Sequence, residues 1–279
     1  MKIGAIIQAR MSSTRLPGKI TKELPYGSGI TALGQVIGRL KKCRSLDEII
    51  VATTTDKTDA GVPSLAKRAG AKAFRGSLED VLARYYMAAK KFNLDIIVRI
   101  TGDCPCVDPE MVDALVRRHL ATKSDYTANV VKLTYPDGFD IEVFNFAALG
   151  AAYEQAREVS DREHVTSYLR NRPKLFKIVS CEAPAGFRRL GMRVTLDTAE
   201  DYTLLCAVYD YLYSPRKAFT FREVTHLLEK KPWLQLINKS SLAKQVFKDR
   251  KEELKRAITL LELWELGGAA AVLKKQLKK

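Results

Sequence analysis

The sequence predicts an α/β protein whose main sheet is largely parallel and is covered by helices on both faces. Short apolar runs rich in β-branched residues alternate with helical periodicities along the first half of the chain, and no internal repeat is present. Parallel strands that alternate with helices are joined by right-handed crossovers, which place the helices over the sheet. Hydrophobic residues occupy 46% of the 279 positions, enough for one large core with an appended segment.

The first half contains three strands and three long helices, each expected from a local pattern. Apolar residues at three- and four-residue spacing indicate the helices, as at Leu33, Val36, Ile37 and Leu40. The expected strands lie at residues 3–7, 48–53 and 95–101, and the expected helices at residues 31–42, 60–69 and 78–92. In such a fold, ligands bind outside the carboxyl ends of the strands.

The alternation changes after residue 120. The polar turn Tyr135-Pro136-Asp137-Gly138 separates strand candidates that no longer alternate with helices. The expected strands lie at residues 125–132, 139–144, 177–182 and 193–196, with one helix at residues 146–156. We therefore expect mixed strand directions and an antiparallel insertion in this region.

The C-terminal segment is more basic than the rest of the chain. Residues 230–279 contain thirteen Lys and Arg against five Asp and Glu, a surplus of eight out of the net charge of +15. The remaining surplus of seven suits an enzyme for anionic substrates as well as a polymer-binding protein. We expect a main domain over residues 1–238 and a basic helical extension over residues 239–279.

The extension shows a helical pattern of its own. Ser240 or Ser241 is positioned to cap a helix that ends at Gly267-Gly268 and is followed by a short helix through Leu277. The apolar stripe of the first helix consists of Leu242, Val246, Leu254, Ile258 and Leu261. This helix could dock on the main domain, pair with a second subunit in a homodimer or present a basic face.

The thiols and the N-terminus both indicate a cytoplasmic protein. The five cysteines are odd in number and form no CxxC pair, so we expect reduced thiols and no thiolate metal site. No run approaches eighteen apolar residues, and the N-terminus becomes polar too early for a signal peptide. We expect no membrane partner.

Residues 8–19, QARMSSTRLPGK, form a cationic loop directly after the first expected strand. The loop after the first strand is the usual phosphate contact of an open parallel sheet. Arg10, Arg15 and Lys19 can reach different phosphates of a triphosphate, while small side chains such as that of Ser13 let the backbone come close. The loop is neither a P-loop nor a dinucleotide fingerprint. Its position favours phosphate binding over the alternative of a solvated basic loop.

Two aspartates follow expected strands. Asp103 comes after the strand at residues 95–101, and Asp197 comes after the strand at residues 193–196. Two carboxylates at strand ends can share one Mg²⁺, which prefers oxygen ligands and usually also binds substrate phosphate. The alternative role of each is a turn or helix-cap aspartate.

Six segments resemble the motifs of sugar-activating cytidylyltransferases, the family that includes the 3-deoxy-manno-octulosonate (KDO) and acylneuraminate cytidylyltransferases. The resemblance is strongest to the branch typified by the spore coat polysaccharide biosynthesis protein SpsF. In family order over about residues 1–238, the segments are QARMSSTRLPGK (8–19), FRGSLEDVLARYY (74–86), RITGDCPCVDP (99–109), YPDGFDIEVF (135–144), REHVT (162–166) and RVTLDTAEDY (193–202).

The resemblance implies a nucleotide-diphosphosugar-transferase fold, GT-A-like and Rossmann-like, with a Mg²⁺-dependent reaction. A sugar oxygen attacks the α-phosphate of CTP and gives a CMP-sugar and pyrophosphate, a displacement that depends mainly on positioning and charge neutralisation. Asp103 and Asp197 are implied to hold the Mg²⁺. Arg15 and Lys19 are implied to contact the β- and γ-phosphates, with Arg10 near the α-phosphate.

The same motifs suggest where the base and the acceptor bind. For the base, the candidates are Ala9, Asp80, Arg84 and Thr101, although Asp80 and Arg84 are spaced to pair with each other on a helix. For the acceptor sugar, the candidates are Asp137, Asp140, Glu142, Glu163 and His164. The carboxylates could bind a polyhydroxylated or amino sugar, assist as a base, or simply face solvent on a strand. TGDCPCVDP and the basic extension depart from the KDO and acylneuraminate enzymes, so the acceptor is left open as an acidic or unusual surface sugar.

Two other functions compete with this one. A glycosyltransferase that uses a pre-made nucleotide sugar shares the fold class, but Asp103-Cys104-Pro105 does not supply the DxD metal motif of such enzymes. A nucleic-acid-binding protein would use the extension, which contains Trp264 but no recognisable groove-reading module. We expect CTP and a sugar or sugar acid as partners, and no nucleic acid.

Overall fold

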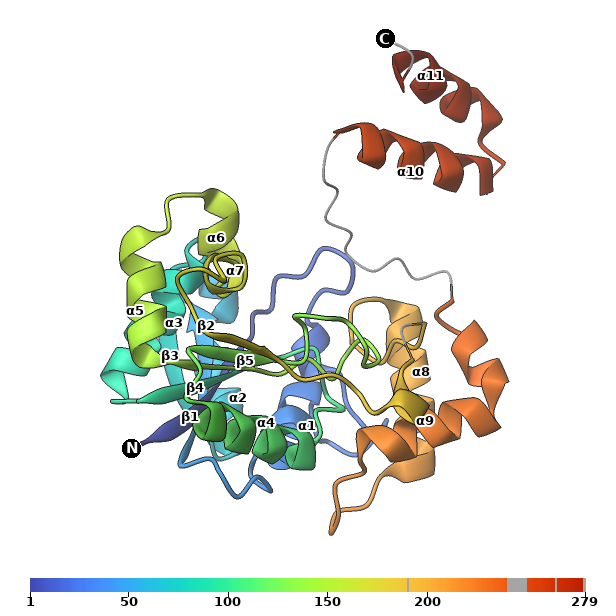
Figure 1. Ribbon diagram of the computed structural model, residues 1–279. Helices are drawn as coiled ribbons and strands as arrows, with labels where there is room; N and C mark the ends of the chain where they lie inside the picture. Colours follow the sequence, from blue (N-terminus) through green and yellow to red (C-terminus); the bar gives the residue numbers. More distant parts are fainter. Residues whose placement is uncertain (190, 240–249, 264, 278–279) are drawn as a thin grey trace. The chain divides into compact units, whose positions relative to one another are not determined.

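The computed structural model describes residues 1–189, 191–239, 250–263 and 265–277 (Figure 1). The chain divides into two compact units, residues 1–240 and 241–279. The second unit contains α10 (Arg250–Leu263) and α11 (Gly267–Leu277). Within the described ranges, no helix is both long and apolar enough to cross a bilayer.

The first unit is built on one sheet. Within its described residues, seven strands lie in the order β3-β2-β1-β4-β6-β5-β7. The strands are β1 (Ile3–Gln8), β2 (Glu48–Thr54), β3 (Lys72–Gly76), β4 (Ile96–Thr101), β5 (Tyr126–Ala128), β6 (Glu142–Asn145) and β7 (Ile178–Ser180). Strands β3, β2, β1 and β4 are parallel, whereas β6 is antiparallel to β4 and β5. The predicted mixed, mainly parallel sheet is confirmed.

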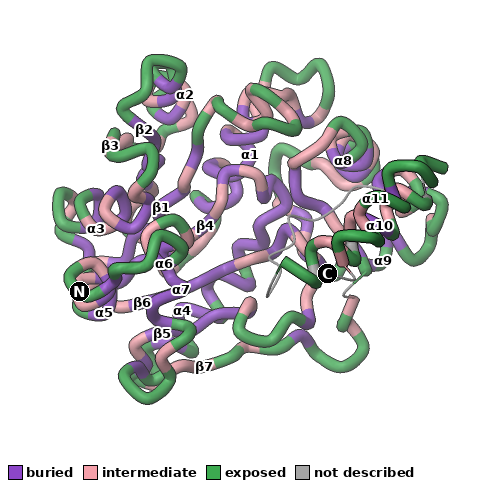
Figure 2. Tube along the Cα trace, turned by 90° about the horizontal axis from the view of Figure 1, so that it is seen from above, coloured by how far each residue is buried: buried purple, intermediate pink, exposed green. Residues whose placement is uncertain are grey.

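Helices pack on both faces of the sheet, as its apolar strands require (Figure 1). One core joins the sheet to α1 (Ala32–Leu40), α2 (Val62–Arg68), α4 (Pro109–Thr122), α8 (Ala199–Leu212) and α9 (Phe221–Lys230). The other core joins it to α3 (Val81–Lys91), α5 (Phe146–Gln155) and α7 (Ser167–Arg170), with α6 (Val159–Glu163) between the last two in sequence. Buried residues follow the strands through the middle of the first unit (Figure 2).

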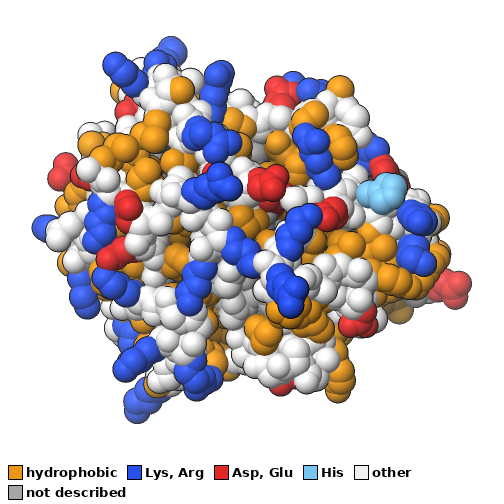
Figure 3. Space-filling model, turned by 90° about the horizontal axis from the view of Figure 1, so that it is seen from below, with side chains coloured by type: hydrophobic (Ala, Val, Ile, Leu, Met, Phe, Trp, Pro, Cys, Tyr) orange, Lys and Arg blue, Asp and Glu red, His pale blue; other side chains and the backbone are white. Residues whose placement is uncertain are grey.

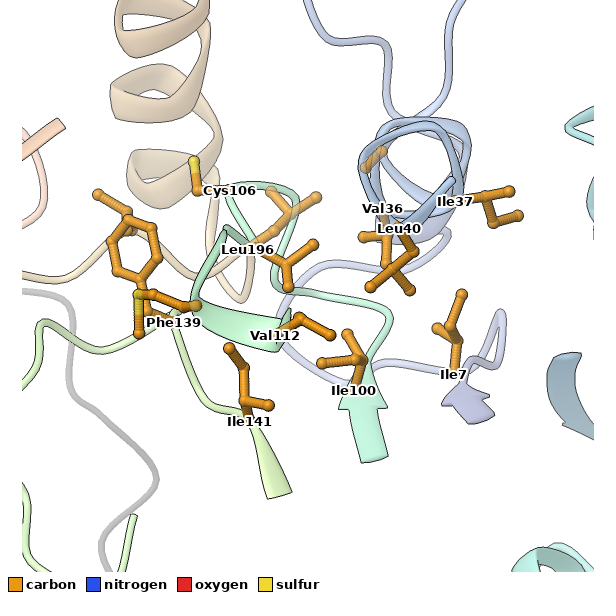
Figure 4. Packing of buried hydrophobic residues seen from close by; sticks show 14 of the residues in the cluster. Ile7, Val36, Ile37, Leu40, Ile100, Cys106, Val112, Phe139, Ile141 and Leu196 are labelled. Carbon is orange, nitrogen blue, oxygen red and sulfur yellow. The ribbon is translucent and has the colours of Figure 1, made fainter. Parts of the chain in front are cut away.

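The first core also anchors loops that leave the carboxyl edge of the sheet. Cys106, Phe139 and Leu196 lie in three different loops, and each is fully buried in the same hydrophobic cluster as Ile100 of β4 (Figure 4). Polar residues close to these anchors in sequence are therefore held at fixed places on that edge.

Residues 193–196 do not form the expected strand. Val194 and Leu196 are buried as a strand pattern would require, but the backbone pairs with loops instead of a ladder. Val194 N donates to Asp137 O at 2.8 Å, and Leu196 N donates to Asp103 O at 2.8 Å. Gly138 makes this contact possible, because a Cβ there, at φ +107°, would lie 2.7 Å from the carbonyl carbon of Val194.

Other expected elements differ in extent. The strands expected at 125–132, 139–144 and 177–182 shorten to the bounds of β5, β6 and β7. Strand β3 and helices α4, α6, α7, α8 and α9 were not predicted. The expected cap at Ser240 or Ser241, with Leu242 and Val246, lies outside the described residues. The long helix of the extension ends at Leu263, and Gly267 begins the next helix, so the end predicted at Gly267-Gly268 is wrong.

Candidate active site

The cationic loop leaves β1 beside the loop that leaves β4. These strands are parallel neighbours with Gln8 opposite Thr101, so residues 9–19 and the turn containing Asp103 emerge at the same edge. Gly102 N donates to Gln8 O at 2.9 Å. A Cβ at Gly102 would lie 3.0 Å from that oxygen, so the absence of a side chain lets the two loops approach each other closely.

Backbone contacts close the cationic loop and fix the start of η1 (Lys19–Thr21). Gly18, at φ +67°, donates its N–H to Met11 O at 3.0 Å. Met11 N in turn donates to Asp59 Oδ1 at 2.6 Å, and Asp59 is fully buried at the end of η2 (Lys57–Asp59). The loop is therefore held from both sides, and Lys19 leaves it at a defined position.

Lys19 brings the two predicted metal ligands together. Its Nζ lies 2.6 Å from Asp103 Oδ2 and 2.8 Å from Asp197 Oδ1. Burial alone would lower the pKa of Lys19, but the two carboxylates outweigh it and raise that pKa above its usual value. Burial likewise opposes ionisation of Asp197, yet Lys19, Arg193 and Arg15 hold its pKa below the usual range. Lys19 and Asp197 therefore stay charged together at neutral pH.

Arg193 is a site residue that the sequence analysis missed. Its guanidinium donates to Asp137 Oδ2 at 2.6 Å and to Asp197 Oδ2 at 2.7 Å. It also pairs with Asp201, which closes the capping box at the start of α8. The spacing of Arg193, Asp197 and Asp201 within RVTLDTAED was the available signal, but the contact with Asp137 spans 56 residues and depends on the fold.

The donor set fits a magnesium ion. Asp103 and Asp197 already hold one cationic group between them, the Lys19 ammonium, so their oxygens converge on a single point. Among the described residues, no group of three or more His, Cys, Asp and Glu side chains forms a protein metal cage. Two carboxylates completed by substrate oxygens are the usual arrangement for Mg²⁺ in phosphoryl-transfer sites.

Of the other two cations of the loop, Arg15 contacts this cluster, whereas Arg10 is exposed. Arg15 contacts Asp197 at 3.0 Å, so it joins the cluster of Lys19 and the two carboxylates. Arg10 is exposed, and Ser13 Oγ accepts a long hydrogen bond of 3.4 Å from Leu16 N.

The residues predicted to read the base divide into two groups. Ala9 and Thr101 lie at the ends of β1 and β4, beside the cluster. Asp80 caps α3 through Ala83 N and forms an ion pair with Arg162, so the expected Asp80–Arg84 pair is not the contact found. Arg84 is buried and donates to Ser77 O at 2.6 Å.

The carboxylates predicted to bind the acceptor have three different environments. Asp137 pairs with Arg193. Glu142 is buried and accepts hydrogen bonds from Arg99, from Tyr126 at 2.5 Å and from Thr166 at 2.5 Å. Asp140 is half-buried and, among the described residues, forms no hydrogen bond or ion pair.

Glu163 is the last residue of the short helix α6 and His164 is its C-cap, two residues before Thr166, which contacts Glu142. Glu163 is exposed and His164 is half-buried. Thr166 therefore connects the REHVT segment to the strand that carries the acceptor carboxylates.

Comparison with known sequences identifies the family. The sequence profile of the cytidylyltransferases matches residues 4–255. The chain belongs to the cytidylyltransferase family. SpsF, the spore coat polysaccharide biosynthesis protein of Bacillus subtilis strain 168, is 37% identical over 232 residues, which are 81% of this chain and 94% of SpsF. The predicted resemblance is confirmed, and the protein is an enzyme of the nucleotidyltransferase class.

Solved structures show the same fold. A cytidylyltransferase from Leptospira borgpetersenii serovar Hardjo-bovis superposes with a TM-score of 0.78 at 34% identity, covering 89% of this chain and all of the other. CMP:2-keto-3-deoxy-manno-octonic acid synthetase, solved with CTP, superposes with a TM-score of 0.56 at 17% identity, covering 75% and 99%. This second likeness shows the fold alone. Membership in the cytidylyltransferase family favours nucleotidyl transfer over the glycosyl-transfer alternative.

Proposed function

We propose that this cytidylyltransferase transfers CMP from CTP to an acidic or unusual surface sugar, releases pyrophosphate and requires Mg²⁺. The observation that carries the proposal is the convergence of Lys19, Asp103 and Asp197 at the carboxyl edge of the sheet, beside a loop with two further cations. Membership in the cytidylyltransferase family supports CTP as the nucleotide. The likeness to SpsF, a polysaccharide biosynthesis protein, supports a surface sugar as the acceptor.

In this mechanism the cationic loop binds the triphosphate. Arg15 and Lys19 contact the β- and γ-phosphates, and Arg10 lies near the α-phosphate. Asp103 and Asp197 would hold the Mg²⁺, which would supply positive charge to the triphosphate. Lys19 and Arg15 contact these carboxylates, so CTP binding would exchange their carboxylate partners for phosphate partners. Fixed cations stabilise the charge that develops on the leaving pyrophosphate.

The other predicted residues complete the two substrate sites. Ala9, Thr101, Asp80 and Arg84 lie on the cytosine side, with Ser13 in the phosphate loop. The acceptor side consists of Asp137, Asp140, Glu163 and His164. Glu142 has a supporting role there, because its buried hydrogen bonds to Tyr126 and Thr166 hold this part of the structure in place. We assign catalysis to residues 1–238 and propose that residues 239–279 form a basic helical extension outside the catalytic machinery.

The experiment that tests this function is pyrophosphate release in the presence of Mg²⁺. CTP, UTP, GTP and ATP are each combined with KDO, a sialic-type nonulosonate or an aminoalkylphosphonate. The proposal predicts release with CTP and an acidic sugar acceptor, together with a higher melting temperature in CTP alone. Preference for another nucleotide, or no thermal stabilisation by any nucleotide, would contradict it.

A further inference from the structure

Asp140 lies at the same edge of the sheet as the phosphate site. Strand β6 runs antiparallel to β4 with Glu142 opposite Arg99, near the carboxyl end of β4. Asp140 precedes Glu142 by two residues, so it lies where β4 ends and the turn containing Asp103 begins. The segment that leads into β6 therefore places the Asp140 carboxylate at the edge of the sheet where the triphosphate is proposed to bind.

The backbone around Asp140 is clamped on both sides. Asn129 Nδ2 donates to Phe139 O at 2.7 Å, and Ile141 N donates to Asn129 Oδ1 at 2.8 Å. Phe139 and Ile141 are fully buried and point into the core (Figure 4). Because successive side chains of an extended segment point to opposite sides, the Asp140 side chain points away from this core.

Asp140 differs from the other carboxylates near it. Asp103 is paired with Lys19, Asp137 with Arg193, and Glu142 with Arg99. Within the described part of the chain, Asp140 has neither an ion-pair partner nor a hydrogen-bond donor, and it remains half-buried. Its carboxylate is thus available to a ligand without displacement of a protein group.

We infer that Asp140 is the proton acceptor of the reaction, taking the proton from the acceptor hydroxyl as that oxygen attacks the α-phosphorus of CTP. This inference rests on the proposed function. The O–H bond breaks with its proton passing to the carboxylate, and the new O–P bond forms. The bond from the α-phosphorus to the oxygen that bridges the β-phosphate breaks, and its electron pair leaves with pyrophosphate.

The surroundings of Asp140 suit this role. Burial raises the pKa of Asp140, and the nearby carboxylates of Asp137, Glu142 and Asp103 raise it further. Arg99 opposes this effect. The resulting pKa of Asp140 is about 7. A general base is most effective when its pKa lies near the working pH. Glu142, by contrast, has its pKa lowered by Arg99, Thr166 and Tyr126 despite its burial, so it is the poorer base.

The first test needs no acceptor. The side-chain carboxyl carbon of Asp140 is observed by nuclear magnetic resonance in selectively labelled protein, with and without CTP and Mg²⁺, and is assigned by its loss in Asp140→Asn. The expected result in the free chain is titration at about 7. Titration near the ordinary value of about 4 would overturn the inference.

The second test follows the rate of pyrophosphate release against pH, with CTP, Mg²⁺ and the acceptor that supports release in the panel. For the wild type, kcat should rise with pH to a plateau above about pH 7, because the base must be deprotonated. Asp140→Asn should lower kcat about 10²–10⁴-fold and lose this rise. Asp140→Glu should keep part of the rate and the rise, and Asp210→Asn, an exposed control, should match the wild type.

Three outcomes separate this role from others. If Asp140→Asn raises KM for the acceptor but leaves kcat and the pH rise intact, Asp140 only positions the acceptor and the inference is wrong. If the variant no longer binds CTP and Mg²⁺ by calorimetry, the residue belongs to the nucleotide site and the inference is again wrong. If the wild type neither binds CTP nor releases pyrophosphate, the proposed function has failed, and the inference falls with it.

Discussion

The two ends of the site differ in how their carboxylates are neutralised. At the proposed phosphate end, Asp103 and Asp197 form ion pairs with two cations of the loop at residues 8–19, Lys19 and Arg15, and these side chains are only partly buried. At the acceptor end, Glu142 is buried with its hydrogen bonds satisfied inside the protein. At the phosphate end, Lys19 and Arg15 can therefore leave their carboxylate partners and bind a ligand instead. The buried ion pair between Glu142 and Arg99 stabilises the folded chain.

This difference separates residues that bind from residues that support. Ion pairs that keep some contact with solvent contribute less to stability than fully buried ones, so changes at the phosphate end should affect folding less than changes at Glu142. A buried pair leaves an uncompensated charge when one partner is removed. Variants at the two ends should accordingly affect activity in one case and stability in the other.

The largest expected effect is on activity at the phosphate end. Lys19→Ala should lower kcat for pyrophosphate release by at least about 10²–10³-fold, because a fixed cation that stabilises the developing charge is lost. Its urea unfolding midpoint should remain close to that of the wild type. Lys67→Ala removes an exposed lysine of α2 and should leave the rate unchanged. Near-normal turnover by Lys19→Ala would show that Lys19 is structural.

The next effect is on stability at the acceptor end. Glu142→Gln should lower the free energy of unfolding by about 3–5 kcal/mol, because it leaves the Arg99 charge without its buried partner. Urea denaturation measures this loss, and Glu154→Gln on the exposed side of α5 is the matched control. Unchanged stability of Glu142→Gln would remove the contrast between the two ends.

Arg193 links the two ends of the site, because its guanidinium pairs with Asp137 on the acceptor side and with Asp197 at the phosphate end. Arg193→Lys should raise the Mg²⁺ concentration for half-maximal rate about 10–100-fold, since an ammonium cannot hold several carboxylates in a fixed geometry as a guanidinium does. A Mg²⁺ titration of pyrophosphate release measures this shift. An unchanged titration would mean that Asp197 does not depend on Arg193 for its orientation.

The smallest expected effect is on the pH dependence of stability, and it concerns His119, which joins α4 to strands β5 and β6. His119 of α4 bonds Thr127 of β5 at 3.1 Å and Asn145 of β6 at 3.0 Å, and burial lowers its pKa. The unfolded chain therefore takes up a proton first, and the contribution of His119 to stability is lost as pH falls below about 6.5, by at most about 1.4 kcal/mol per pH unit.

The measurement is the difference in unfolding free energy between the wild type and His119→Gln at pH 7.5 and pH 5.5. This difference should shrink at the lower pH. His226→Gln, which alters an exposed histidine of α9, is the matched control. A constant difference for His119→Gln would show that the buried ring is not held neutral.

The sequence predicted the parts of the site that local patterns determine. The loop at residues 8–19 follows an apolar strand, and that order alone placed Lys19 at the edge of the sheet. Asp103 likewise follows a strand, and the structure places it within ion-pair distance of Lys19. The fold class followed from the alternation of strands and helices, which depends on local periodicity.

The sequence did not predict contacts that depend on long-range packing. Arg162 reaches Asp80 over 82 residues, so the local pairing expected between Asp80 and Arg84 is replaced. Residues 193–196 have a strand pattern, but they pair with loops at Asp137 and Asp103 because Gly138 allows a close approach. The sequence also does not show that Asp140 has no hydrogen bond or ion pair with any residue the structure describes, since its neighbours obtain their cations from other strands and loops.

The charge of the chain did not identify its function either. Figure 3 shows Lys and Arg side chains spread over one face of the molecule, with Asp and Glu side chains among them. The cations that we propose to act in the reaction are instead the few that meet carboxylates at the sheet edge.

The most direct test of the central claim is a crystal structure of the chain with CTP and Mn²⁺ in place of Mg²⁺, with the ion located by its anomalous signal. The account predicts the ion between Asp103 and Asp197, with Lys19 moved from these carboxylates to the triphosphate. An ion bound elsewhere, or Lys19 still bridging the two carboxylates with the triphosphate outside the loop at residues 8–19, would contradict it.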